Sequence, residues 1–302
     1  MKVSINKKYS KNKFSYFITS DELFNINLKN QSENLIFINK SPMFKYAFGN
    51  YYNPAYVCWW ALINLEEFVK TGNEKFKNIF LDQAKWLLKN AKDRKSAKVW
   101  TYDFNWNEGK TKLKKGWISA MSQGLAISVL VRAYYITKNK KFLRIAYDAS
   151  KIFKIDIEFG GVSTTVNKSV FYEEYPAYPL VHVLDGFIFS LLGLYDLYLV
   201  EKNNSIKILF KAGSDSIENN FSIWDHKKKW SFYGTRGLLC TPKYNKLNSV
   251  LLNALFNITN KDKFKEYSNN WNQDKFSFVK KTSCYYDYFI FWLKYRLNNI
   301  SG

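Results

Sequence analysis

The sequence predicts a mainly α fold: an incomplete α/α toroid of helical hairpins, with β-hairpin insertions and a short β-rich N-terminal segment. Three observations support this prediction. A short polar turn between two apolar helices recurs along the chain, the helix after the clearest turn is amphipathic, and longer segments of β and turn character separate the pairs. Repetition of one supersecondary unit predicts stacking, because a single helical hairpin cannot bury its own apolar face.

The recurring turn reads TGNEKF at 71–76, TKNKKF at 137–142 and TNKDKF at 259–264, with a weaker copy at 201–204. In each copy a polar residue can cap the second helix and the phenylalanine can pack that helix on its partner. Four hairpins are expected from Pro54 to about Gln273, with a closing helix near 285–297. Spacing alone leaves an open solenoid as an alternative. After the first turn, one helix face holds Phe76, Ile79, Phe80, Ala84, Leu87 and Leu88.

The chain is expected to divide into a short β-rich N-terminal segment, 1–48, and a toroid-like domain, 49–302. The N-terminal segment holds two stretches that read as strands, 14–18 and 35–38. Two short strands are too few for a stable sheet, so they are expected to pack on the helices that follow.

Three longer segments, 99–117, 158–179 and 223–244, lie between the helical pairs. Insertions in repeat architectures gather on one face, which is often the binding face, so their polar side chains are expected to converge. Each candidate also has an ordinary explanation, such as a solvated charge pair or a core phenol. The candidates in these segments and at the helix starts beside them are Asn105, Trp106, Glu108, Gln123, Glu173, Glu174, Tyr175, Asp185, Tyr233, Arg236 and Tyr244.

The formal net charge of +21 has two explanations. An anionic polymer could bind along a basic groove, or coding bias could favour lysine, since arginine occupies only positions 94, 132, 144, 236 and 296. Nucleic acid is disfavoured, because the chain shows no recognised module and no arginine cluster. The aromatic content of 19% suits a carbohydrate groove, although most of these rings are expected in the core.

Three cysteines and two histidines limit the chemistry. Their number and spacing predict no disulfide framework and no metal site, and they give little support to a Ser-His-Asp triad. The first residues lack the apolar core of a signal peptide, and the apolar run 180–200 contains His182, Asp185 and Asp196, as a buried helix would. The expected location is the cytoplasm, with membrane association during glycan biosynthesis and homodimer formation left open.

The run GWISAMSQGLAISVLVR at 116–132, EEYP at 173–176 and VLDGFIFSLLGLYDL at 183–197 together resemble the C-terminal domain of the D-glucuronyl C5-epimerase family. That resemblance covers about 49–271. It implies an α/α toroid-like domain and an enzyme, an isomerase that converts glucuronate to iduronate in precursors of heparan sulfate-like glycans.

The resemblance also implies roles for residues. Glu174, Tyr175, Tyr233 and Tyr244 match the acid/base set of the family, and Arg236 completes its Tyr-x-x-Arg motif. The substrate-contacting positions differ: the family has asparagine where Asp185 stands and tyrosine where Phe189 stands. Further positions expected to bind substrate are Asn105, Trp106, Glu108, Gln123, and Tyr56 and Trp59, which stand where the family has two glutamines.

Inversion at C5 requires a base on one face of the sugar and an acid on the other, for which Tyr175 and Tyr244 are expected to serve. The charge that develops beside the uronate carboxylate must be offset, and Arg236 is expected to do this. A nearby cation is also expected to lower the pKa of the phenols. No cofactor is required, and no dinucleotide fingerprint is present.

Three alternatives remain on the sequence alone. A uronate polysaccharide lyase shares the first proton abstraction. A non-catalytic glycan-binding protein would explain the altered substrate positions. An inverting glycosidase would need two separated carboxylates, which Glu108 or Asp185 could supply with Glu174.

Overall fold

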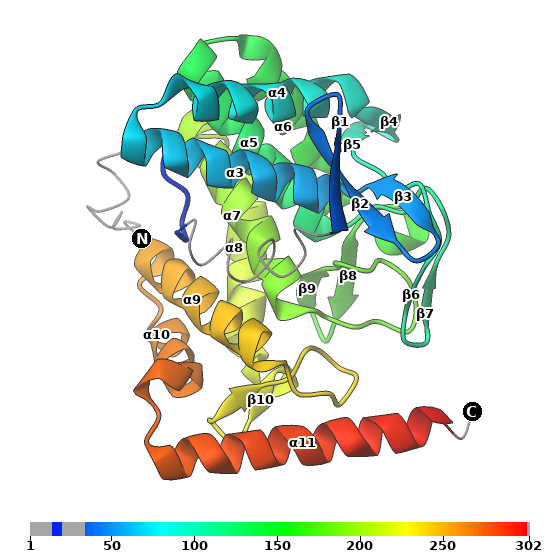
Figure 1. The fold of residues 1–302 in the computed structure, drawn as a ribbon, viewed down its shortest axis with the longest axis vertical. Helices are drawn as coiled ribbons and strands as arrows, with labels where there is room; N and C mark the ends of the chain where they lie inside the picture. Colours follow the sequence, from blue (N-terminus) through cyan, green and yellow to red (C-terminus); the bar gives the residue numbers. More distant parts are fainter. Residues whose placement is uncertain (1–13, 20–33, 301–302) are drawn as a thin grey trace.

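A computed structural model describes residues 14–19 and 34–300, and the side chains up to residue 297. Within this part, four helical hairpins follow one another and a last helix closes the chain (Figure 1). The predicted toroid of hairpins is confirmed. The hairpins are α3 (Pro54–Thr71) with α4 (Glu74–Asn90), α5 (Ala120–Thr137) with α6 (Lys140–Ser150), α7 (Leu184–Glu201) with α8 (Asn204–Asn219), and α9 (Pro242–Thr259) with α10 (Asp262–Trp271), followed by α11 (Phe278–Ile300).

The first helices of the hairpins form the inner layer, because α3 packs on α5, α5 on α7 and α7 on α9. Each second helix packs outside its own partner. Helix α7 is buried from Leu184 to Leu197, which explains why its sequence is apolar on every side. The core therefore lies between these inner helices.

The recurring turn ends one helix of each hairpin and begins the next through hydrogen bonds at the helix ends. Each first helix ends at a residue with positive φ, whose N–H donates to the carbonyl oxygen four residues earlier. Asn73, Asn139 and Asn203 then cap the second helices by accepting a hydrogen bond from the N–H two residues on. The fourth copy begins at Lys261, whose side chain makes no cap.

In the described residues of the N-terminal part, β1 (Leu35–Ile38), β2 (Ser41–Tyr46) and β3 (Gly49–Tyr52) form a three-stranded antiparallel sheet. The strand at 35–38 is confirmed, but the strand predicted at 14–18 is wrong. Tyr16, Phe17 and Ile18 are buried in the helical core, and the carbonyl oxygens of Phe14 and Ser15 accept hydrogen bonds from Arg132. The Arg132 guanidinium therefore donates to carbonyl oxygens that would otherwise accept hydrogen bonds from a neighbouring strand.

The segments between helical pairs contain short antiparallel hairpins, as expected. Short 3-10 turns occur at 151–154, 157–159, 221–223 and 273–275. The hairpins are β4 (Lys92–Arg94) with β5 (Ala97–Val99), β6 (Trp106–Glu108) with β7 (Thr111–Leu113), β8 (Ser163–Val166) with β9 (Ser169–Tyr172), and β10 (Asp225–His226) with β11 (Trp230–Ser231).

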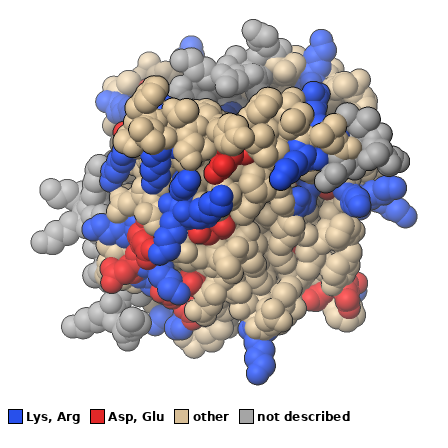
Figure 2. Space-filling model, turned by 90° about the horizontal axis from the view of Figure 1, so that it is seen from below, with Lys and Arg blue, Asp and Glu red and all other residues tan. Residues whose placement is uncertain are grey.

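The high positive charge does not gather in a single groove on the face seen in Figure 2. Lys and Arg side chains are spread over this face, with Asp and Glu beside some of them and broad uncharged areas between. Among the described helices, none combines the length and the apolar character needed to cross a bilayer.

Two glycines allow the closest helix contact of the inner layer. A Cβ on Gly193 of α7 would overlap the backbone of Gly124 on α5, and a Cβ on Gly124 would overlap the backbone at Phe189 and Ser190. Beside this contact, Arg132 of α5 and Asp196 of α7 form a buried ion pair at 2.5 Å.

We expect Gly193→Ala to destabilise the protein. The added methyl group would force two backbones apart, which costs more than alanine gains in helix propensity, a net loss of about 2 kcal/mol in the free energy of unfolding. Denaturant titration measures this. Gly72→Asn is the control, because Gly72 has φ +69° and no atom near its Cβ position. Equal stability of Gly193→Ala and the wild type would contradict the close contact.

Candidate active site

An aromatic pocket of about 300 Å³ opens between the N-terminal sheet, α3 and the insertions. Rings make up most of its wall, and Tyr102 stacks on Trp117 with their centroids 3.9 Å apart. Sequence reasoning missed Phe44, Tyr46 and Asn53 here, because the sheet that carries them is placed only by tertiary packing. Of the predicted site residues, the pocket brings together Tyr56, Trp59, Trp106, Glu174, Tyr175 and Tyr244.

Three tyrosines lie together at this site: Tyr175 and Tyr244 line the pocket, and Tyr233 contacts both of them without lining it. The hydroxyl oxygens of Tyr175 and Tyr233 are 3.4 Å apart, and the rings of Tyr233 and Tyr244 lie 6.2 Å apart, edge to face. Tyr175 follows β9, Tyr233 follows β11, and Tyr244 lies in the first turn of α9, where Thr241 caps the helix. Two insertions and one helix start therefore place these phenols together.

Burial raises the pKa of all three phenols above the usual value. Carboxylates raise the pKa further: Glu174 acts on Tyr175 and Tyr233, and Asp185 and Glu174 act on Tyr244. The expected lowering of the pKa by a nearby cation is therefore wrong for this structure. At neutral pH the tyrosines are hydroxyl donors.

Glu174 and Asp185 form a buried acidic pair. Glu174 is 7% exposed, packs over Gly186 in the first turn of α7, and has an Oε2 atom without a hydrogen-bond partner. Burial raises the pKa of Glu174 well above its usual value, and the neighbouring Asp185 raises it further. Burial also raises the pKa of Asp185 to about 6, against the lowering effect of two backbone N–H groups at the helix start. Burial and Asp185 therefore favour the protonated form of Glu174 more than in an exposed glutamate.

Glu173 has a different environment from its neighbour. Its Oε1 lies 2.6 Å from His182 Nδ1 and accepts a hydrogen bond from Thr164, and its Oε2 accepts one from the His182 N–H. His182 in turn has φ +52°, and its carbonyl oxygen accepts from Trp224. Glu173 therefore fixes the loop that ends at α7, while Glu174 faces the pocket.

Six predicted substrate residues lie outside the lining of this pocket: Asn105, Glu108, Gln123, Asp185, Phe189 and Arg236. Gln123 is buried and donates to the Trp100 carbonyl oxygen at 3.3 Å. Phe189 is buried under Trp59, with the ring centroids 6.3 Å apart. Asn105 is exposed, and its side chain accepts from the Lys115 N–H at 2.7 Å.

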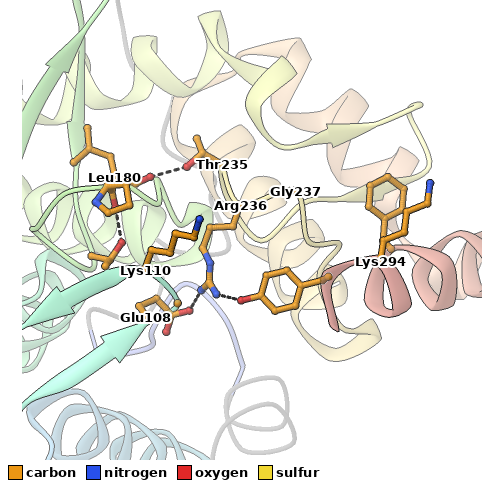
Figure 3. A pocket seen from close by; sticks show the side chains of 12 residues that line it. Glu108, Lys110, Leu180, Thr235, Arg236, Gly237 and Lys294 are labelled. Carbon is orange, nitrogen blue, oxygen red and sulfur yellow. Dashed lines mark hydrogen bonds and ion pairs between the residues drawn. The ribbon is translucent and has the colours of Figure 1, made fainter. Parts of the chain in front are cut away.

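Arg236 lines a second cavity of about 520 Å³, which we call the basic cleft. Its guanidinium binds the carboxylate of Glu108 and the hydroxyl of Tyr295 (Figure 3). The other oxygen of Glu108 accepts from the indole of Trp106 at 3.3 Å, so one carboxylate joins the cleft to the aromatic pocket. Lys110 and Lys294 also line the cleft. Sequence reasoning missed Lys294 and Tyr295, because no local signal connects α11 to Arg236.

The comparisons with known proteins agree with this architecture. A sequence profile described as D-glucuronyl C5-epimerase C-terminus matches residues 92–273, more than half of the chain. The chain belongs to this family. The match includes the three tyrosines, the acidic pair and Arg236, but ends before α11.

Two relatives show how far the likeness extends. The chain is 35% identical over 175 residues to a D-glucuronyl C5-epimerase of Caenorhabditis elegans, covering 54% of this chain and 28% of the worm protein. It is 30% identical over 179 residues to an uncharacterised protein of Methanocaldococcus jannaschii, covering 58% of this chain and 57% of that protein. The aligned region thus spans less than two thirds of either relative.

Solved structures share the fold at low sequence identity. A family 76 glycoside hydrolase, a mannosidase from Bacteroides thetaiotaomicron, aligns with a TM-score of 0.53 at 10% identity, over 84% of this chain and 70% of that one. A cellobiose 2-epimerase from Bacillus thermoamylovorans aligns with a TM-score of 0.53 at 12% identity, over 83% of this chain and 69% of that one.

Within the described residues, no group of three or more His, Cys, Asp or Glu side chains could hold a metal ion.

The acidic pair gives the protein a testable pH dependence. Because the pKa of Asp185 lies above its unfolded value of about 4, its contribution to stability is present below pH 4 and is lost as the pH rises to about 6. Asparagine mimics the protonated form, so Asp185→Asn should match the wild type at pH 4 and exceed it at pH 7.5. The expected gain in the free energy of unfolding is on the order of 2 kcal/mol.

Urea unfolding at both pH values measures this difference. Asp196→Asn is the matched control, because Asp196 is equally buried but pairs with Arg132, so its loss should destabilise the protein at pH 7.5. An Asp185→Asn variant less stable than the wild type at both pH values would contradict the assignment.

Proposed function

We propose that this protein is a carbohydrate epimerase that inverts C5 of a hexuronate residue within a glycan. The observation that carries the proposal is the convergence of Tyr175, Tyr244 and Glu174 on one aromatic pocket, with the Tyr233 hydroxyl 3.4 Å from Tyr175. The ring-lined wall suits the C–H faces of a sugar. Membership of the epimerase family supports the reaction class.

The chemistry requires a proton to leave one face of C5 and another to arrive on the opposite face. Because the phenols are protonated at neutral pH, the tyrosine that acts as base first gives up its hydroxyl proton to solvent. The phenolate formed in this way removes the C5 proton, and the electron pair of that bond passes into the carboxyl group as an enediolate. A phenol on the other face then gives its proton to C5, which restores the carboxylate with inverted configuration. We assign the two faces to Tyr175 and Tyr244, and Tyr233 can pass a proton to or from Tyr175 through their hydroxyl contact.

Glu174 is the group best placed to offset the developing charge. A neutral carboxylic acid donates a hydrogen bond to the uronate carboxyl group, and that bond strengthens as negative charge accumulates there. Its unpartnered oxygen is buried, so the interaction would form away from bulk water. The sequence suggested Arg236 for this task, but the residues lining the aromatic pocket include no lysine or arginine.

Arg236 is better placed to hold the glycan beside the reacting sugar. It lines the basic cleft with Lys110 and Lys294, and Glu108 links that cleft to the pocket through Trp106. A charged group on a neighbouring sugar could bind there while the uronate occupies the pocket. The glycosidase alternative is weakened by the same geometry, because Glu108 is already paired with Arg236.

We expect Tyr175→Phe and Tyr244→Phe each to lower kcat by about 100-fold or more, because each removes an acid or base acting at C5. The assay incubates the protein in heavy water with glucuronate oligosaccharides, N-sulfated and non-sulfated, and follows C5 by NMR. Deuterium at C5 with an iduronate signal supports epimerisation. An unsaturated, ultraviolet-absorbing uronate would instead identify a lyase.

Tyr172→Phe is the matched control for these variants. Tyr172 is buried, whereas Tyr175 and Tyr244 are partly buried; it lies outside the pocket lining, and its hydroxyl donates to the Leu209 carbonyl oxygen. It should retain nearly full exchange. Full activity in the Tyr175→Phe, Tyr244→Phe double variant would overturn the mechanism, and tight glycan binding without exchange in the wild type would favour a binding protein.

Replacing Arg236 should separate binding from chemistry. Loss of a charge-assisted hydrogen bond to substrate costs roughly 1.5–3 kcal/mol, so Arg236→Gln should raise KM by about tenfold or more with a smaller change in kcat. Tyr295→Phe keeps the charge of Arg236 and should leave KM nearly unchanged. A fall in kcat at constant KM would instead place Arg236 at the reacting carbon.

A further inference from the structure

Helix α11 has one apolar face that packs on the body of the protein. Cys284, Tyr288, Phe291 and Tyr295 recur at helical spacing. Cys284, Tyr288 and Phe291 pack in a small core with Trp230 and Leu239, and Tyr295 reaches Arg236. An interaction between His226 and Asp287 at 3.0 Å also connects the helix to the body. This face accounts for the docking of α11.

The opposite face of α11 carries a second apolar row that nothing in the described residues covers. Val279, Tyr286, Phe289 and Leu293 recur at the same spacing, half a turn away from the packed row. Their exposed fractions are 76%, 65%, 53% and 39%. In Figure 1 the helix runs along the edge of the molecule, with the body on one side only. Such a continuous exposed row marks an interaction surface.

The flanks of this row are basic. Lys281, Lys294 and Arg296 lie between the packed face and the exposed face, and among the described residues no ion pair to a carboxylate engages them. The Arg296 guanidinium lies 4.7 Å from the Trp292 ring centroid. The acid of α11, Asp287, is already engaged by His226. The partner of this surface must therefore tolerate or supply negative charge.

A second copy of the chain fits this surface poorly, because two α11 helices packed through their apolar rows would bring basic flanks together without acids to oppose them. An anionic bilayer complements both the apolar row and its basic flanks. Apolar and aromatic side chains enter the boundary between headgroups and acyl chains, and flanking lysines and arginines contact acidic headgroups. We propose that the exposed face of α11 binds the surface of a membrane containing anionic phospholipids, with the helix lying in the plane of the membrane.

This binding would also orient the rest of the molecule. Lys294 and Tyr295 belong to α11 and line the basic cleft, so the cleft lies beside the membrane-facing helix. A glycan close to the bilayer would then reach the cleft without crossing the protein. The membrane proposal itself does not depend on the epimerase activity, since it rests on α11 alone.

The test is flotation of the full chain with vesicles of phosphatidylcholine alone or with about one third phosphatidylglycerol. The wild type should float with the anionic vesicles, bind neutral vesicles far less, and be released by salt. Tyr286→Ser, Phe289→Ser and Leu293→Ser combined should abolish flotation. Lys281→Gln with Arg296→Gln should weaken binding by about fivefold per charge removed.

Matched controls separate membrane binding from loss of fold. Phe159→Ser and Ile208→Ser remove side chains that are 66% and 58% exposed on other elements, so these variants should float like the wild type. Circular dichroism and thermal unfolding should be unchanged in the triple variant. Flotation unaffected by that variant, or no flotation of the wild type, would overturn the proposal. A wild-type dimer that becomes monomeric in the triple variant would also overturn the proposal, because the exposed face of α11 would then be a dimer interface.

Discussion

The close contact between α5 and α7 is the constraint on which the candidate site depends. Gly124 and Gly193 let two buried helices approach at backbone distance, and the Arg132–Asp196 pair adds a second connection. The start of α5 is in turn tied to the insertion, because the Ala120 N–H donates to the Glu173 carbonyl oxygen at 3.0 Å. The position of Glu174 over the first turn of α7 follows from these contacts.

That position carries an electrostatic cost. Two buried carboxyl groups, Glu174 and Asp185, lie together, so their ionised forms are disfavoured and both pKa values are raised. The N–H groups at the start of α7 offset part of this cost at Asp185. An acid kept neutral in this way can donate a hydrogen bond, which a carboxylate cannot. The surroundings that penalise charge on Glu174 also raise the pKa of the tyrosines, so acid and phenols act as one coupled set.

Local signals made the fold predictable, and the resemblance to the epimerase family singled out the tyrosines. The turns could be read from asparagine caps, and the insertions could be expected on one face because the hairpins repeat. The sequence did not predict how deeply each candidate side chain is buried, or which distant residues it contacts. Phe189 and Gln123 lie on helices that are apolar all round, so the sequence does not show which side faces a pocket. The stretch 14–18 alternates like a strand, yet its backbone is satisfied by Arg132, which lies more than a hundred residues away.

The placement of Arg236 shows the same limit at the site itself. Its motif predicted a place beside Tyr233, three residues earlier, but the side chain turns to Glu108 of β6 and Tyr295 of α11. Because Glu108 also accepts from Trp106, any ligand that draws Arg236 away would leave that carboxylate beside the wall of the aromatic pocket. Glu108 therefore connects its ion pair with Arg236 to Trp106, which forms part of the pocket wall.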